Sequence, residues 1–180
     1  MTILERLEKR EKKLLSRIAY IKRLISAGHF DAAESDRLWL ESFTVGKVGL
    51  DICAGDMVTG DSVGVDMAHD VLGVDYMTDG DNLSFAGPGD FDYIISNYFD
   101  AFPSGLAALN EWHRVLKVGG VAAFICCDSK KYNKPLGPMA NKKRQSCYTT
   151  ETIKCYMERA AFKNVQITES EQMLRVYGQK

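Results

Sequence analysis

Short apolar runs that each end in glycine, aspartate or asparagine dominate the sequence between residues 46 and 100. Four of them are expected to be strands, at residues 48–52, 62–66, 74–77 and 91–96. Apolar residues keep helical spacing at about 104–117, and Gly119-Gly120 should stop that helix before a fully apolar strand at 121–127. Continuous apolar strands that alternate with helices are typical of a mostly parallel sheet covered on both faces. The sequence therefore predicts an α/β fold with a doubly wound, mostly parallel sheet.

The carboxyl-terminal part adds one helix and two strands. Thr149 or Thr150 is suited to open a helix that runs to about Ala161. Residues 165–170 and 173–179 alternate along their length and lie close enough in sequence to pair. We therefore expect the sheet to end in an antiparallel hairpin.

The amino-terminal segment has the pattern of an amphipathic helix. From Leu4 to Ile25 apolar residues recur at steps of three and four, which predicts a helix over residues 3–26. Its apolar stripe is suited either to packing on its own domain, which we favour, or to a coiled coil in a homodimer.

A second, shorter helix is expected next, with Asp31 or Ser35 as its cap and Leu38, Trp39 and Phe43 on its apolar side. The chain should thus consist of a helical extension over residues 1–45 and one globular domain over residues 46–180.

The cysteines and the apolar content bear on the compartment of the protein. The five cysteines are odd in number and have no metal-type spacing, so we expect free thiols and no metal site. The first residues carry charges every few positions, and no apolar stretch approaches ~18 residues. We therefore expect a cytoplasmic protein without a membrane span.

Polar residues at three consecutive strand ends form a candidate ligand site. In an open parallel sheet, ligands bind beyond the carboxyl ends of the strands. The small residues Cys53, Ala54 and Gly55 follow the first strand and would let a ligand approach the backbone. Asp66 ends the second strand, where a carboxylate can accept hydrogen bonds from both hydroxyls of a ribose. Asp79 follows the third strand.

Two further interpretations concern a nucleoside base at this site. The Asp79 carboxylate can accept the exocyclic amine of adenine, and the soft side chain of Met67 can pack on the base. Taken singly, each aspartate is explained by a turn or a helix cap as well as by ligand binding.

Charge narrows the type of ligand. Residues 51–100 contain eleven aspartates and no lysine or arginine, although the formal net charge of the chain is only −1. Such a region repels a dinucleotide pyrophosphate and suits a positively charged sulfonium. The pattern therefore favours S-adenosylmethionine over a nicotinamide dinucleotide.

At this point the chain resembles a family, the class I (Rossmann-like) S-adenosylmethionine-dependent methyltransferases, in a compact variant with a shortened first helix. The matching segments, in order, are VGLDICAGD, GVDMAHD, TDGDNLSF, FDYIISNYFDAF, LAALNEWHRVLKVGG and YTTETIKCYMERAAFKNVQI. The family usually has glycine where Cys53 stands. The resemblance implies methyl transfer and cofactor contacts by Asp51, Cys53, Ala54, Gly55, Asp66, Met67, Asp79, Gly80, Asn97 and Tyr98.

The methyl acceptor is not identified by the sequence. Displacement at a sulfonium needs alignment and exclusion of water more than a catalytic group. Tyr98 and Asp100, which follow the fourth strand, are the candidate catalytic residues, with Asp100 as a base. A basic stretch over residues 129–150 is suited to guide an anionic small molecule or a nucleic acid. A catalytically silent cofactor-binding module and another nucleotide-binding Rossmann-type enzyme are the alternatives.

Overall fold

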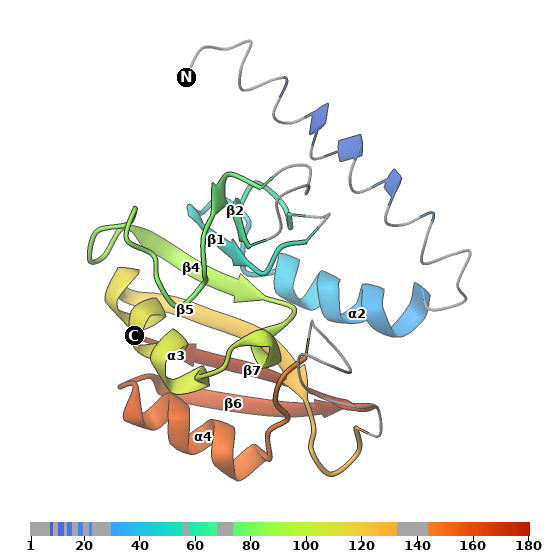
Figure 1. The fold of residues 1–180 in the computed structure, drawn as a ribbon, viewed down its shortest axis with the longest axis vertical. Coiled ribbons are helices and arrows are strands. Elements are labelled where there is room, and N and C mark those ends of the chain that lie inside the picture. The colour runs from blue at the N-terminus through green and yellow to red at the C-terminus, as the bar shows by residue number, and fades with distance from the viewer. Residues whose placement is uncertain are drawn as a thin grey trace.

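The structure is a computed structural model that describes residues 30–55, 58–67, 74–132 and 144–180, together with residues 8, 11–12, 14–15, 18–19 and 22 of the amino-terminal segment. Its strands form one seven-stranded sheet in the order β3-β2-β1-β4-β5-β7-β6. Their bounds are β1 Gly49–Ile52, β2 Val63–Asp66, β3 Tyr76–Met77, β4 Phe91–Ser96, β5 Leu116–Cys127, β6 Lys163–Ser170 and β7 Met173–Gln179. Figure 1 shows this sheet running from β2 and β1 at one side to β6 at the other.

The sheet confirms the predicted fold class. Neighbouring strands are parallel except at β7, which runs antiparallel to both β5 and β6. The expected carboxyl-terminal hairpin is the pair β6 and β7. Strand order proceeds from β1 in both directions, so it reverses between β1 and β4, where doubly wound sheets bind their ligands.

Helices cover both faces of the sheet, in three layers. The helices are α2 Phe30–Glu41, α3 Gly105–Val115 and α4 Thr150–Arg159, with a 3-10 turn η1 at Phe99–Ala101. Side chains of α3 and α4, including Leu109 and Ile153, share a core with Ile94 and Phe124. On the opposite face, Leu40 of α2 packs in a core with Ile95 and Ile125.

This arrangement explains the unbroken apolar strands. Ile94 and Ile95 are neighbours in β4, and each is fully buried in a different one of the two cores. Successive side chains of a strand point to opposite faces. A central strand with both faces covered therefore has no position left for alternating polar residues.

The boundary between α3 and β5 lies earlier than predicted. The helix ends at Val115 and the strand begins at Leu116, so Gly119 and Gly120 lie inside β5 instead of stopping the helix. Leu116 has extended backbone angles and pairs with Phe91 of β4. A register shift then absorbs the extra residues around Gly119, whose φ is +78°. Strand pairing thus decides where this helix ends.

Two details of α2 also differ from the prediction. The helix begins at Phe30, so Asp31 and Ser35 lie within it and do not cap it. Leu38 is 54% exposed, whereas Leu40 is buried against the sheet. Trp39 and Phe43, the other two residues of the expected apolar side, pack against the same core as Leu40, so the prediction fails only at Leu38. The domain boundary near residue 45 stays a prediction, although α2 already packs on the sheet.

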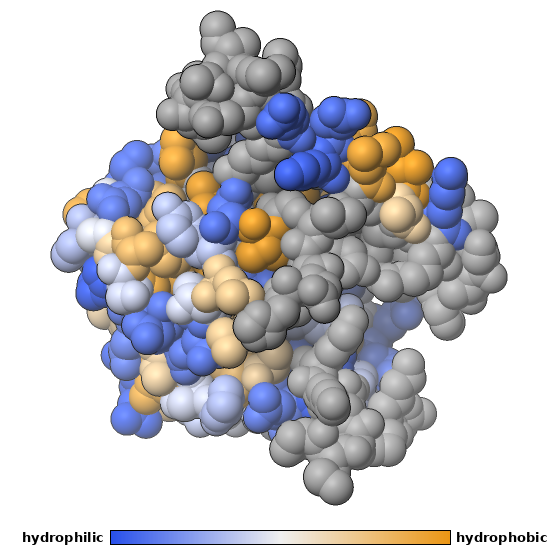
Figure 2. All heavy atoms as spheres, turned by 45° about the horizontal axis from the view of Figure 1, so that its top comes forward, coloured by the Kyte–Doolittle hydropathy of each residue, from blue (hydrophilic) through white to orange (hydrophobic). Residues whose placement is uncertain are grey.

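The described residues of the amino-terminal segment are helical and exposed. They include Leu14, Leu15 and Ile18, which are 59%, 55% and 42% exposed. Of these, Leu14 and Ile18 belong to the predicted apolar stripe. Its other members, Leu4, Leu7, Ile21 and Ile25, lie outside the described residues, so packing of this helix on the domain stays a prediction. Figure 2 shows apolar residues in small separate areas among hydrophilic ones on the face in view. Within the described residues, no helix has the length and apolarity that crossing a membrane requires.

Candidate functional site

The carboxyl ends of the central strands lie side by side. Ile52, the last residue of β1, is in register with Val65 of β2 on one side and Ser96 of β4 on the other. Asp66, at the end of β2, is in register with Met77 of β3. The residues that follow these strands therefore meet at one edge of the sheet, as the sequence predicted.

The turn after β1 is tight and open on one side. Cys53 and Gly55 both have φ of +56°, the left-handed region in which a side chain is strained. The Ala54 N–H donates to the Val65 carbonyl at 3.3 Å, which fixes the turn against β2. A Cβ placed on Gly55 would have no atom within 4 Å. The turn can thus bring backbone close to a ligand, which is what the sequence predicted for it.

Cys53 stands in a conformation that glycine adopts more easily. We expect Cys53→Gly to change the free energy of unfolding by no more than about 1 kcal/mol, because relief of backbone strain offsets lost packing. The β-branched Cys53→Val should destabilise the protein by about 1–2 kcal/mol more than the glycine variant does. Urea unfolding of both variants measures the difference. Equal stabilities would show that the backbone here relaxes freely.

Asp66 joins the ends of β1 and β2. Its Oδ2 accepts a hydrogen bond from the Gly55 N–H at 2.8 Å, and the residue is partly exposed. A carboxylate is thereby fixed beside the open turn. Met67 follows it and is exposed, with its side chain on the surface near the same edge.

Asp79 and Gly80 are held at the end of β1 by packing. A Cβ on Gly80 would lie 2.1 Å from Cγ2 of Ile52 and 2.8 Å from Cζ of Phe102. The Gly80 carbonyl accepts a hydrogen bond from Nε1 of the buried Trp112 at 2.8 Å. Gly80 is therefore required for close packing, and it positions the exposed Asp79 beside β1.

Gly80→Ala should destabilise the protein by about 1–3 kcal/mol, because the new methyl group would overlap two buried side chains. Gly87→Ala is the matched control, since its Cβ would meet nothing nearer than the flexible Asp90 carboxylate at 3.2 Å. Thermal unfolding followed by circular dichroism compares the two. A Gly80 variant as stable as the Gly87 variant would contradict the packing role.

Asp51 is buried in β1, directly before the last residue of the strand, Ile52. Its Oδ2 accepts the Thr59 N–H at 2.7 Å, which ties the chain after the turn back to the strand. No sequence pattern indicated this contact, because Thr59 looks like any loop residue. Asp51 therefore shapes the turn from inside the domain.

Asp100 is fully buried at the tip of β4, and it is less accessible than the role of a base requires. Its Oδ2 accepts the Cys127 N–H at 2.9 Å and pairs with the Arg144 guanidinium, while its Oδ1 has no hydrogen-bond partner among the described residues. Burial raises the pKa of Asp100 to about 6, although Arg144 and the Cys127 N–H lower it. The carboxylate thus serves first as an anchor for Arg144.

Asn97 and Tyr98 precede Asp100 and are only partly buried. The Arg144 guanidinium carbon lies over the Tyr98 ring, 4.9 Å from its centroid. Tyr98 is therefore positioned by a cation from a distant part of the chain. Because Arg144 is 44 residues from Asp100, no local pattern pointed to this contact.

The described cations of the basic stretch are less available to a ligand than the sequence suggested. Lys130 lies 3.5 Å from Glu151 and Lys131 lies 2.5 Å from Glu169. With Arg144 paired to Asp100, every arginine and lysine of this stretch that the structure describes has an acidic partner. The remaining cations, Lys134, Lys142 and Lys143, are outside the described residues.

The expectation that all five cysteines are free thiols is wrong for one pair of them. Cys127, at the end of β5, forms a disulfide with Cys147, and their Cα atoms are 5.0 Å apart. Cys53, Cys126 and Cys155 are free. Parallel pairing of Asp128 with Tyr148 brings the two segments together, which the spacing of the cysteines could not indicate.

No protein-family model matches the sequence, and no curated protein does either. The fold, however, is similar to solved S-adenosylmethionine-dependent methyltransferases. One from Thermotoga maritima, described as a possible histamine N-methyltransferase, has a TM-score of 0.69 and 17% identity over 94% of this chain and 99% of its own. One from Archaeoglobus fulgidus has a TM-score of 0.62 and 14% identity, covering 80% and 90% of the two chains.

A third structure shows two ligands. It is the 1,6-didemethyltoxoflavin-N1-methyltransferase of Burkholderia thailandensis, with 1,6-didemethyltoxoflavin and S-adenosylhomocysteine bound. Its TM-score is 0.65 at 14% identity, over all of this chain and 91% of its own. Together these likenesses show that the chain has the class I, Rossmann-like methyltransferase fold.

Proposed function

From this fold we propose that the chain is an S-adenosylmethionine-dependent methyltransferase that acts on a small molecule. One observation carries the proposal: the Asp66 carboxylate is bonded to the N–H of Gly55, in a turn whose outer side is open. An anion is thus fixed next to accessible backbone, at the point where strand order reverses. This is the arrangement that a ribose and an adjoining cationic sulfonium need.

The residues at the three tips suit the parts of this cofactor. The Asp66 carboxylate would accept the ribose hydroxyls, Asp79 the adenine amine, and Met67 would pack on the base. Gly55 and Ala54 would give the methionine portion close access to backbone. Asp51, Cys53 and Gly80 would shape this surface instead of bonding to the cofactor, because hydrogen bonding or packing already engages them.

The cofactor supplies a methyl group already activated on a sulfonium, so the protein has to align the acceptor and exclude water. Asn97 and Tyr98 lie at the tip of β4, next to the end of β1, and would orient the acceptor there. Asp100 would contribute by holding Arg144 against Tyr98. We assign it no proton transfer, because its carboxylate is buried and engaged.

Two observations favour a small acceptor. The described cations of the basic stretch all have acidic partners, which partly offsets the charge they would offer to a nucleic-acid backbone. The related folds from Thermotoga and Burkholderia carry descriptions that refer to small-molecule acceptors. The proposal therefore does not require an anionic acceptor.

The proposal includes a cytoplasmic location, which stays a prediction. Stable disulfides are rare there, so the Cys127–Cys147 bond would be reversible. A homodimer formed through the amino-terminal helix also stays a prediction.

Isothermal titration of the full chain with S-adenosylmethionine, S-adenosylhomocysteine and NAD tests the proposal. We expect saturable binding of the first two and none of NAD. Binding of NAD alone would refute it in favour of another nucleotide-binding enzyme. A screen of amine, phenol and heteroaromatic acceptors for release of S-adenosylhomocysteine then separates an enzyme from a silent binding module.

A further inference from the structure

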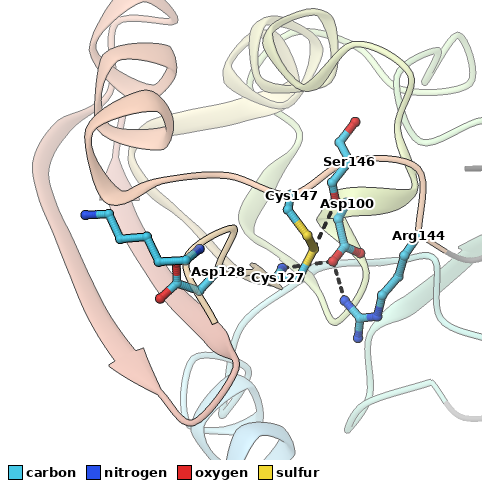
Figure 3. The surroundings of a disulfide bond; sticks show 7 residues. Asp100, Cys127, Asp128, Arg144, Ser146 and Cys147 are labelled. Carbon is cyan, nitrogen blue, oxygen red and sulfur yellow. Dashed lines mark hydrogen bonds and ion pairs between the residues drawn. A yellow bond between two sulfur atoms is a disulfide. The ribbon is translucent and has the colours of Figure 1, made fainter. Parts of the chain in front are cut away.

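A disulfide lies beside the strand tip that carries the proposed acceptor contacts. Cys127 is the buried last residue of β5, and Cys147 is partly exposed, 20 residues further along the chain. Figure 3 shows Asp100 between this disulfide and Arg144. The bond therefore joins the sheet to the segment that contacts the tip of β4.

Backbone hydrogen bonds anchor that segment on both sides. The N–H groups of Gln145 and Ser146 donate to the Asp100 carbonyl at 2.8 and 3.2 Å. The Tyr148 N–H donates to the Cys127 carbonyl at 3.0 Å. Residues 144–148 are thus fixed between η1 and the end of β5, and Cys147 within them carries the disulfide.

The same short segment supplies the cation that positions Tyr98. Arg144 pairs with the buried Asp100 carboxylate, and its guanidinium lies over Tyr98 at 4.9 Å and over Tyr132 at 5.7 Å from the ring centroids. Arg144 is three residues from Cys147. A change in the disulfide is therefore transmitted over a short length of chain to the tip of β4.

We propose that the Cys127–Cys147 disulfide is a redox-controlled clasp on the acceptor side of the site. When the bond is formed, it holds residues 144–147 and keeps Arg144 on Asp100 and Tyr98. When the bond is reduced, the segment loses its covalent anchor and Arg144 leaves Tyr98 more often. The cofactor side, at β1 and β2, is unaffected because its contacts do not pass through this segment.

Reduction by a dithiol follows ordinary exchange chemistry. A thiolate of the reagent attacks Sγ of Cys147, the partly exposed sulfur, and the bond to Cys127 breaks. Cys127 leaves as a thiolate and takes up a proton. The second thiol of the reagent then releases Cys147 as a thiol and closes the cyclic disulfide of the reagent. Two electrons and two protons have passed from the dithiol to the protein.

The first test establishes the bond. Full-length protein purified without reductant is alkylated with iodoacetamide under denaturing conditions and digested for mass spectrometry. We expect Cys127 and Cys147 in one linked peptide pair, and Cys155, which is exposed and free, carrying the alkyl group. Free, alkylated Cys127 and Cys147 would overturn the proposal.

The second test follows the segment by hydrogen exchange, before and after treatment with dithiothreitol. Exchange of the Gln145 and Ser146 amides should become roughly tenfold or more faster, with β1 and β2 unchanged. Cys147→Ser should behave like reduced protein without any reductant, while Cys155→Ser, the matched control, should keep the response. Unchanged protection of Gln145 and Ser146 on reduction would overturn the clasp.

Measuring the binding of S-adenosylhomocysteine distinguishes a failure of the clasp from a failure of the proposed function. The affinity for S-adenosylhomocysteine should differ by less than about twofold between oxidised and reduced protein, because the proposed cofactor contacts lie at the ends of β1, β2 and β3. A chain that binds no S-adenosylhomocysteine in either state would refute the methyltransferase and leave the exchange result to decide the clasp. A large loss of affinity on reduction would contradict a clasp confined to the acceptor side.

Discussion

Asp66→Asn should lower the affinity for S-adenosylhomocysteine by roughly ten- to hundredfold, since each lost charge-assisted hydrogen bond is worth about 1.5–3 kcal/mol. The amide side chain keeps the size of the carboxylate but cannot accept two hydroxyl protons with a negative charge. Isothermal titration of wild-type and variant protein measures the change. An unchanged affinity in a folded variant would remove Asp66 from the cofactor site.

The structure supplies a matched control for this substitution. Asp75 accepts the Gly64 N–H through Oδ2 at 2.8 Å, the same length as the bond from Gly55 to Asp66. Asp75→Asn thus removes an equivalent carboxylate contact to backbone, away from the strand tips. We expect this variant to bind S-adenosylhomocysteine like the wild type. Equal losses in both variants would indicate a general effect on the sheet instead of a lost ribose contact.

Arg144→Ala should lower the free energy of unfolding by about 3–5 kcal/mol above pH 7, because it leaves a buried carboxylate without its cation. The pH dependence follows from Asp100, whose pKa burial raises from 3.8 to about 6. Because this pKa is higher in the folded state, protonation of Asp100 contributes to the free energy of unfolding. That contribution is fully present below pH 3.8 and is lost as the pH rises through about 6. Without Arg144 this pKa rises further, so the loss extends to higher pH.

Urea unfolding between pH 4 and 8 measures this effect. The difference between Arg144→Ala and wild type should shrink toward pH 4, where the Asp100 carboxyl is protonated in both. In an Asp100→Asn background the arginine substitution should cost much less and depend little on pH. A loss of the same size at pH 4 and pH 8 would show that Arg144 stabilises the protein by packing on Tyr98 and Tyr132 instead of by charge.

Local patterns in the sequence determined the sheet and one side of the site. Apolar runs and helical spacing are short-range signals, and parallel strands bring their carboxyl ends to one edge whatever the connections between them. Gly55 and Asp66 could therefore be placed together before any coordinates, and the structure joins them by a hydrogen bond. The sequence also predicted a helix opened by Thr149 or Thr150, and it is the Thr149 hydroxyl that accepts the Thr152 N–H.

Only the tertiary structure decided the other side of the site. The ion pair of Asp100 with Arg144 and the disulfide of Cys127 with Cys147 join residues 44 and 20 positions apart, across a connection whose path no local pattern encodes. The start of β5 at Leu116 likewise depends on pairing with Phe91, which overrides the local preference for helix. Burial, charge pairing and cross-linking depend on which segments meet in space, and only the folded chain determines that.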